Sequence, residues 1–402
     1  MNIFLAYPGI LIGSGGMEKV CASLANALCD RGHDVTVGYC YKGEERPFYS
    51  YKKSISLHSL MTGHLFSKPV LGRCITRRQK AFREVLRLFS RSYARGWNEC
   101  CKSQLIRENL KNELIKSHPD VVISFGPDMT YYIQQTYCKL PVITMFHMEP
   151  SHILEIAPKI EISALQQGTI TQVLMPSFQK TIQHYCGNIP TVFIPNYVEQ
   201  FYYDEKKREN RPLKTIINIA RVNKDQKRQH LLIEAFAKIS QDFPEWNVEL
   251  WGDKETYPAY VEEIKKLIQK YGLKERVFLK GTTERIEEAL LKADIFCFPS
   301  AYEGFGLSMT EAMSAGLPVV AFQSCPAVNE IVQNNVTGVL VDDGIDSLAS
   351  GLRQLMEDQA RRIWMGNNAH DAMKKYAPDK VWDQWEDLIE YTIQRFKSRG
   401  NI

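Results

Sequence analysis

The chain has 402 residues, more than one hydrophobic core usually contains, so at least two domains are expected. Hydrophobic residues make up 44% and charged residues 24%, ordinary globular values that exclude a largely disordered chain. The formal net charge of +4 hides a local excess, because residues 65–116 contain 13 Lys and Arg against 4 Asp and Glu. Such a block predicts an anionic partner for one face.

The chain shows no targeting or membrane-spanning pattern. No basic segment precedes Pro8 and Gly9, which argues against a signal peptide, and no run of about 18 apolar residues predicts a membrane span. The ten cysteines are scattered without a C-x-x-C pair, which is typical of free thiols and argues against a disulfide framework or a zinc site. We therefore expect a cytoplasmic location.

The first forty residues predict a strand, a glycine-rich loop, a helix and a second strand. Residues 2–7 are apolar, residues 13–16 read Gly-Ser-Gly-Gly, and apolar residues from Met17 recur at helical spacing up to Arg31-Gly32. Val35 then begins the next strand. Further strands are expected at 120–124, 141–145, 171–175 and 191–194, with helices between them. This alternation predicts a parallel sheet.

A polar stretch at 203–212 is typical of a linker, and the alternation restarts after it. Strands are expected at 215–220, 247–251, 276–279, 294–298 and 318–321, with helices near 227–240, 258–271, 284–292 and 306–315. The predicted fold class is α/β, with two doubly wound, Rossmann-like domains. Because nucleotides bind beyond the carboxyl ends of such strands, the loops there are expected to carry the chemistry.

Two of these loops suit a phosphate-containing ligand. Gly15 and Gly16 precede a helix, whose first N–H groups are able to bind phosphate, although a tight turn explains the glycines equally well. Arg221 follows the first strand of the second half, and Lys227 lies near the next helix start. The two cations are placed to neutralise a diphosphate; a solvated basic turn is the alternative.

The loop and helix after the predicted strand 294–298 are the most informative. Glu303 lies in the loop, Gly304 and Gly306 leave backbone N–H groups accessible, and Glu311 lies inside the helix. Two carboxylates on either side of such N–H groups suit a ligand with hydroxyls at both ends and phosphate between them. A nucleotide sugar is such a ligand. A surface glutamate and a helix cap are the alternative.

The spacing of Glu303 and Glu311 resembles the E-x7-E signature of the retaining glycosyltransferases of family 4, also called group 1. The glycine loop at 15–20, the turn at 31–35, the Arg-x5-Lys spacing with its continuation at 227–237, and the segments 311–320 and 335–341 are similar to the same family. The resemblance covers nearly the whole chain except about 42–118. It is specific for the family and much less so for the substrate.

The resemblance implies the GT-B fold, in which two Rossmann-like domains face each other across a cleft. Residues 1–200 would form an N-terminal acceptor-binding domain, and residues 213–376 a C-terminal domain that binds the nucleotide-sugar donor. The helix at 377–402 would pack back on the N-terminal domain.

The resemblance also implies roles for the matching residues. Glu303 would contact the donor sugar and Glu311 the ribose, while Arg221 and Lys227 would hold the diphosphate. His147 matches the family histidine near the sugar, although a lone histidine at a strand end is more often structural. The residues implied in catalysis are Glu303, His147, Arg221 and Lys227. Those implied in donor binding are Gly15, Gly16, Arg221, Lys227, Glu303, Gly304, Phe305, Gly306, Leu307 and Glu311.

Three positions depart from the family pattern. The stretch after Trp251 lacks a second glycine, and Met148 stands where the family often has Asp, with Glu149 as a possible substitute. The segment 323–326, Gln-Ser-Cys-Pro, replaces a glycine pair before Glu330. That segment looks closer to a branch that often uses UDP-galactose or UDP-N-acetylhexosamines.

The implied reaction moves a hexose or N-acetylhexosamine, with retained configuration, from a UDP-linked sugar to a glycan in polysaccharide or glycoconjugate synthesis. Enzymes of the family typically need no metal, so no cofactor is expected, and Asp342-Asp343-Gly344 is interpreted as a turn. Two alternatives stay open. One is a nucleotide-sugar epimerase on the same fold, and the other is a non-catalytic sugar-nucleotide-binding protein.

The basic segment 70–116 is the part that the resemblance explains least. Its Lys and Arg alternate with apolar residues at helical spacing, namely Phe82, Val85, Leu86, Phe89, Tyr93 and Trp97. Such a helix suits an anionic bilayer, which would make the acceptor lipid-linked and the protein peripheral on the inner face of the cytoplasmic membrane. Packing of the apolar stripe on the first sheet is the alternative. Nucleic-acid binding is not expected, because no recognition motif accompanies the charge.

Overall fold

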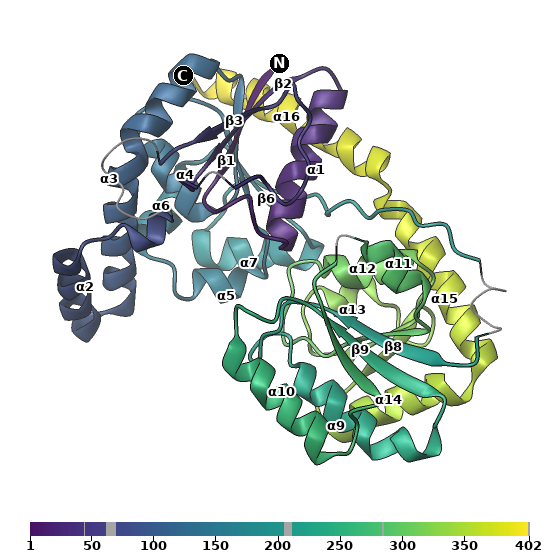
Figure 1. Cartoon of the computed structure of the whole chain (residues 1–402). Coiled ribbons are helices and arrows are strands. Elements are labelled where there is room, and N and C mark those ends of the chain that lie inside the picture. The colour runs from purple at the N-terminus through teal and green to yellow at the C-terminus, as the bar shows by residue number, and fades with distance from the viewer. Residues whose placement is uncertain (44, 62–69, 205–210, 284, 401–402) are drawn as a thin grey trace. The chain divides into compact units, whose positions relative to one another are not determined.

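The computed structural model describes residues 1–43, 45–61, 70–204, 211–283 and 285–400 (Figure 1). The chain divides into two compact units, one formed by Met1–Pro195 with Val381–Ile402 and the other by Asn196–Lys380. The domain limits expected from the sequence were residues 200, 213 and 377. Most of the expected linker, residues 205–210, lies outside the described residues.

The first unit is built on a seven-stranded parallel sheet with the order β3-β2-β1-β4-β5-β6-β7. Its strands are β1 (Asn2–Tyr7), β2 (Asp34–Tyr39), β3 (Ser56–Ser59), β4 (Val121–Ser124), β5 (Val142–Met145), β6 (Ile170–Val173) and β7 (Thr191–Phe193). Its helices include α1 (Gly16–Asp30), α2 (Arg77–Phe89), α3 (Arg91–Ser117), α4 (Pro127–Gln134), α5 (Pro150–Leu154), α6 (Lys159–Gln167) and α7 (Pro176–Cys186). Strand β3 was not expected from the sequence.

The second unit is built on a six-stranded parallel sheet with the order β10-β9-β8-β11-β12-β13. Its strands are β8 (Lys214–Ile219), β9 (Trp246–Trp251), β10 (Val277–Gly281), β11 (Ile295–Phe298), β12 (Val319–Phe322) and β13 (Gly338–Val341). Its helices include α9 (Gln229–Ile239), α10 (Pro258–Lys270), α11 (Ile286–Leu291), α12 (Leu307–Ser314), α13 (Val328–Ile331), α14 (Ile345–Glu357) and α15 (Gln359–Met373). The α/β class with two parallel-sheet domains is thus confirmed.

The strand order of the second unit reverses between β8 and β11. The chain builds β8, β9 and β10 toward one edge, then returns to place β11 beside β8 and continues to the other edge. The loops that leave β8 and β11 therefore diverge at their carboxyl ends, which is where open α/β sheets bind their ligands. Arg221 and Lys227 lie after β8, and Glu303 lies after β11.

The C-terminal helix α16 (Pro378–Gly400) belongs to the first unit from Val381 onward. Val381 and Ile389 are fully buried there. Two polar contacts join the helix to the turn after α1: Arg31 Nη2 lies 2.8 Å from Asp383 Oδ1, and His33 Nε2 lies 2.9 Å from Glu386 Oε1. Apolar burial, rather than the partly exposed ion pairs, accounts for most of the stability of such a contact.

Helices α2 and α3 form a hairpin whose two arms differ sharply in burial. Helix α3 buries Ile106, Leu110 and Leu114 among sheet residues such as Phe4 and Val122. None of the 13 residues of α2, all of them described, is buried. Figure 1 shows α2 beside α3 and away from the sheet. Packing of the apolar stripe on the sheet is therefore wrong for its residues in α2, and Tyr93 at the start of α3 is exposed as well. Helix α3 packs on the sheet through residues further along the helix. No helix in the described part of the chain combines the length and hydropathy needed to cross a bilayer.

A close backbone approach between α15 and the turn before β12 yields a stability prediction. A Cβ atom added at Gly366 would lie 2.3 Å from the backbone oxygen of Gly316. Alanine is normally favoured over glycine inside a helix by about 1 kcal/mol. Here we expect Gly366→Ala to destabilise the protein by about 1–3 kcal/mol, because the backbone of α15 or of the turn at Gly316 must move to make room for the methyl group. The measurement is the free energy of unfolding in urea.

Gly96→Ala in α3 is the matched control, since its Cβ would meet side-chain atoms rather than backbone, namely the Cβ of Pro158 at 3.3 Å and the Cδ1 of Ile160 at 3.9 Å. Its cost is expected to be smaller. A Gly366→Ala protein as stable as the wild type would contradict the prediction.

Candidate active site

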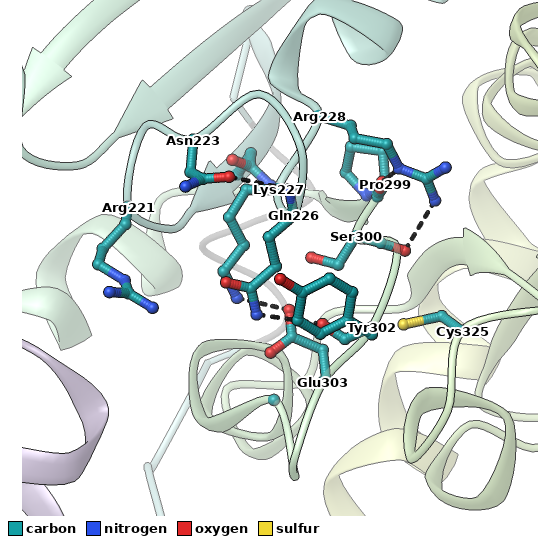
Figure 2. A network of polar contacts seen from close by, with 12 residues as sticks. Arg221, Asn223, Gln226, Lys227, Arg228, Pro299, Ser300, Tyr302, Glu303 and Cys325 are labelled. Atoms are coloured by element: carbon teal, nitrogen blue, oxygen red, sulfur yellow. Dashed lines mark hydrogen bonds and ion pairs between the residues drawn. The ribbon is translucent and has the colours of Figure 1, made fainter. Parts of the chain in front are cut away.

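The loops after β8 and β11 are joined by backbone and amide hydrogen bonds (Figure 2). The N–H of Ala301 donates to the carbonyl of Gln226 at 2.8 Å, and Gln226 Nε2 donates to the carbonyl of Tyr302 at 3.2 Å. Gln226 itself is held by Asn223, whose Oδ1 accepts from its N–H at 2.8 Å. Gln226 was not predicted as a site residue from the sequence. These bonds fix the two loops that carry Lys227 and Glu303.

Lys227 and Glu303 form an ion pair between these loops. Lys227 Nζ lies 2.5 Å from Glu303 Oε1, and the two side chains are only 11% and 7% exposed. The ammonium also lies 5.2 Å from the ring centroid of Phe298, the last residue of β11. Because an ammonium has three N–H donors, Lys227 is able to keep this contact and still donate to a phosphate oxygen.

Arg221 lies in the same loop as Lys227 and is exposed. Gln229 Nε2 donates to its carbonyl at 2.9 Å and so anchors its backbone to the first turn of α9. Figure 2 shows the side chains of Arg221 and Lys227 extending in the same direction from the loop. The structure thus places two cations of the expected set on one side of the loop.

The loop after β11 leads into the N-terminus of α12. Gly306 is the N-cap residue with φ of +77°, a left-handed conformation that glycine adopts without strain. Leu307 follows as the first helical residue, and Glu311 lies in the second turn, 4% exposed. Phe305 is buried, with its ring 5.3 Å from that of Tyr376, so it faces the core. The backbone of Gly304–Leu307, more than its side chains, is therefore the part suited to contact a ligand.

The glycine loop of the first unit leads into α1, with Gly15 as N-cap and Gly16 as the first helical residue. A Cβ atom at Gly15 would lie within 2.4 Å of the Glu18 carboxylate, so the loop closes around this acidic residue. Glu18 thus already supplies a negative charge near the start of α1, a feature that sequence reasoning missed. The expected approach of Gly15 and Gly16 to a diphosphate held by the second unit stays a prediction.

His147 follows β5 in the first unit and is held by stacking. Its ring lies 5.0 Å from that of Phe125, with the planes 15° apart. Its Nε2 is buried and finds no hydrogen-bond partner among the described residues. Burial lowers the pKa of His147 from 6.5 to about 4, so the ring is neutral at neutral pH.

Glu149 does not take the place of the aspartate that often follows this histidine in the family. Its carboxylate caps α5 and accepts from the N–H groups of Ser151 and His152, at 3.0 Å each. The carboxylate is therefore occupied by a helix cap.

Asp343 has structural partners that explain the acidic turn after β13. Its carboxylate accepts from Arg228 Nη1 at 3.3 Å and from the hydroxyl of Ser324. Over the described ranges, no group of three or more His, Cys, Asp or Glu side chains is arranged to hold a metal ion. Arg228 and Ser324 were not identified from the sequence, because nothing in a basic turn or a polar loop indicates which distant loop it will contact.

The pKa of His147 gives a testable pH dependence. Between about pH 6.5 and 4 the unfolded chain binds a proton at this position that the folded state does not, so the protein loses stability as the pH falls through this range. His147→Gln is expected to make that slope shallower and to leave stability above pH 7 nearly unchanged.

The measurement is the free energy of unfolding in urea at several pH values. An NMR titration of the ring signal that disappears in His147→Gln gives an independent midpoint. A midpoint near 6.5 would contradict the prediction.

Comparison with known proteins finds a family that matches the second unit. Residues 199–377 match the family described as glycosyl transferases group 1. An exopolysaccharide phosphotransferase of Streptomyces coelicolor is 27% identical, over 95% of this chain and 40% of that protein. An uncharacterized glycosyltransferase of Haemophilus influenzae is 23% identical, over 94% of this chain and 97% of that protein.

A solved structure agrees on the fold. The structure of Staphylococcus aureus TarM, in complex with fondaparinux, α-GlcNAc-glycerol and UDP, matches with a TM-score of 0.74 at 16% identity, over 97% of this chain and 100% of that chain. This likeness supports the GT-B fold for the pair of α/β units. Lys227, Glu303 and Glu311 all lie inside the segment that matches the group 1 glycosyltransferases.

Proposed function

We propose that the protein transfers a hexose or N-acetylhexosamine from a UDP-linked sugar to a glycan acceptor, with retained anomeric configuration. The observation that carries the proposal is the nearly buried Lys227–Glu303 pair at the point where the strand order reverses. The presence of UDP and α-GlcNAc-glycerol in the TarM structure supports the choice of donor and acceptor class. Because this chain spans only 40% of the Streptomyces relative, the activity is proposed from the site.

The proposed chemistry centres on the departing nucleoside diphosphate. When the bond between the sugar and the β-phosphate breaks, negative charge grows on the phosphate oxygens, and Lys227 and Arg221 are placed to neutralise it. The first N–H groups of α12 lack partners within the helix and add positive potential for phosphate. These fixed groups supply the charge stabilisation without a metal ion in our proposal.

The two carboxylates have separate tasks in this proposal. Glu303, held by Lys227, accepts hydrogen bonds from donor-sugar hydroxyls, while Glu311 accepts from the ribose hydroxyls. Neutral His147 offers a ring nitrogen to the sugar without adding a charge near the reacting carbon. The acceptor hydroxyl then attacks the sugar carbon on the same face that the diphosphate leaves and passes its proton to the departing phosphate oxygen, which gives retention.

Product analysis separates this proposal from its two alternatives. A transferase releases free UDP together with a glycosylated acceptor, an epimerase returns an isomerised nucleotide sugar, and a binding protein returns the donor unchanged. A thermal-shift panel of UDP, GDP and ADP with their common sugars identifies the base, because a ligand that binds only the folded state raises Tm.

Removal of either cation tests the diphosphate assignment. We expect Arg221→Ala and Lys227→Ala each to lower kcat about 10²- to 10³-fold, measured in excess EDTA, which the wild type should tolerate. Arg221→Ala should fold normally, since Arg221 is exposed. Lys227→Ala should also lose stability, because it leaves the carboxylate of Glu303 buried and unpaired.

Two variants control for this loss of stability. Lys227→Met combined with Glu303→Gln removes the unpaired charge and should recover stability but not turnover. Lys224→Ala removes an exposed lysine of the same loop, paired with Glu263 at 2.6 Å, and should keep normal kcat. Near-normal turnover in both Arg221→Ala and Lys227→Ala would show that the assignment is wrong.

We further propose that the transferase works at an anionic bilayer through α2, so that its acceptor is lipid-linked and the protein is peripheral on the inner face of the cytoplasmic membrane. Helix α2 carries five basic residues and one acidic residue, Glu84. Large apolar side chains on α2 and at the start of α3 remain in solvent: Leu88 is 84%, Phe89 81% and Tyr93 59% exposed. Exposed apolar groups flanked by Arg and Lys are the composition of helices that lie in a membrane interface.

Internal contacts keep the hairpin formed while this surface stays exposed. The rings of Phe82 and Trp97 lie 4.7 Å apart, and Trp97 Nε1 donates to the carbonyl of Gln79 at 3.2 Å. A capping box between Thr76 and Gln79 starts α2. The apolar groups that remain exposed are therefore those that the hairpin itself does not need.

Vesicle co-sedimentation tests the bilayer proposal. Binding is expected to rise steeply with anionic lipid content and to weaken with salt, since each basic residue near such a surface contributes roughly 1 kcal/mol. The triple variant Arg83→Gln, Arg87→Gln and Arg91→Gln should lose most of this binding.

The control removes the same charge from the second unit, at Lys265, Lys270 and Arg285. It should bind like the wild type. Equal binding to neutral and anionic vesicles, or none to either at low salt, would contradict the proposal.

A further inference from the structure

Arg228, the neighbour of Lys227, adopts a backbone conformation that residues with a Cβ atom rarely take. Its φ is +49° and its ψ is 41°, in the left-handed region. Such a conformation is strained and persists only where surrounding contacts hold it. It also turns the two neighbouring side chains apart: Figure 2 shows Lys227 pointing toward Glu303 and Arg228 pointing toward Pro299 and Ser300.

The contacts of the Arg228 guanidinium join three loops at the carboxyl edge of the sheet. Nε donates to the carbonyl of Pro299 at 2.9 Å, and Nη2 donates to the carbonyl of Ser300 at 3.0 Å, both in the loop after β11. Nη1 donates to Asp343 Oδ1 at 3.3 Å, in the loop after β13. The guanidinium carbon lies 4.8 Å from the ring centroid of Phe322, the last residue of β12.

The position of the Lys227 backbone depends on that of Arg228. The N–H groups of Lys227 and Arg228 both donate to the carbonyl of Asn223, at 3.0 and 3.1 Å. A shift of Arg228 therefore moves the backbone from which the Lys227 side chain extends. Glu303 lies three residues beyond Ser300, so the same guanidinium fixes the loop of each partner in the ion pair.

We infer that Arg228 is a positioning residue for glycosyl transfer, which clamps the loops after β8, β11 and β13 and so holds Lys227 at the place where the leaving phosphate develops its charge. This inference rests on the proposed function. Only an arginine is able to do this, because its planar fork donates in several fixed directions and stacks on an aromatic ring, whereas the ammonium of a lysine is a compact point charge that lacks this fork.

Arg228→Lys keeps the charge and removes the fork. We expect its kcat to fall roughly tenfold to a hundredfold, the effect of a displacement of about 1 Å at a catalytic group, with a smaller change in the donor KM. Arg228→Gly relieves the positive φ and leaves room for free guanidinium. Its kcat should fall similarly and recover in part when guanidinium chloride is added below denaturing concentrations.

Arg276 is a matched control in the same unit. Its guanidinium also donates to backbone carbonyls, those of Trp246 and Phe243 at 2.6 Å each and that of Ser240 at 3.5 Å, and lies 5.4 Å from the ring centroid of Phe236. It lies at the amino end of β10, the edge opposite to the site. Arg276→Lys and Arg276→Gly should lower Tm, keep kcat and donor KM, and show no rescue of turnover by guanidinium.

Wild-type kcat and donor KM in Arg228→Lys, or a loss no larger than in Arg276→Lys, would overturn the inference. If Arg228→Lys does not fold, Asp343→Asn decides instead. It removes the charge from one partner of the clamp and should lower kcat severalfold; unchanged kcat overturns the inference. A wild type that turns over no nucleotide sugar would overturn the proposed function, whereas an active wild type with equally active Arg228→Lys and Asp343→Asn variants would overturn the clamp alone.

Discussion

The ion pair of Lys227 and Glu303 is the contact around which the second unit arranges its strand-end loops. Removing two charges from water costs several kcal/mol per ion, and their mutual attraction returns this only when the geometry is good. An apolar pair would serve stability at least as well at this position. Here the ring of Phe298 lies against the ammonium of Lys227, and the hydrogen bonds of Gln226 hold together the two loops that carry the pair. We interpret the ion pair at this position as a requirement for charge at a fixed place, because catalysis by electrostatic preorganisation needs such a charge.

Two groups around the ion pair of Lys227 and Glu303 add no unpaired charge next to it. Cys325 lies beside it in the loop after β12, and burial holds the pKa of its thiol well above the ordinary value, so it remains protonated. The carboxylate of Asp343 is engaged by Arg228 and Ser324. Glu303 is therefore matched by Lys227, and Arg221 remains on the exposed side of the loop as a second cation for an anionic ligand. Such a distribution favours a diphosphate over a neutral ligand.

Much of the fold followed from the sequence because buried parallel strands are short, continuous apolar runs. The strand of residues 294–298 and its neighbour at 318–321 are of this kind, and both were predicted within two residues. Strands β3 and β13 were not predicted. Ser56–Ser59 is half-buried and polar in pattern, so it lacks the continuous apolar run of a buried strand. Strand β13 lies at the edge of its sheet and begins with Gly338, which is not typical of a strand. The resemblance assigned Lys227 to the diphosphate and Glu303 to the donor sugar, but it did not imply that the two side chains form an ion pair. The reach of Arg228 depends on a positive φ and on loops more than 70 residues away, which no local pattern encodes.

Burial also distinguishes the two arms of the basic hairpin, although one sequence pattern covers both. Helix α3 is 27 residues long and buries Ile106, Leu110 and Leu114 against the sheet. None of the 13 residues of α2 is buried, and a capping box and packing on α3 support this helix. A helix of that length is marginal in isolation. An apolar surface that neither the core nor the hairpin uses weakens solubility unless a partner covers it. Because the same helix concentrates positive charge, an anionic, partly apolar partner satisfies both features at once, and a bilayer surface has that chemistry.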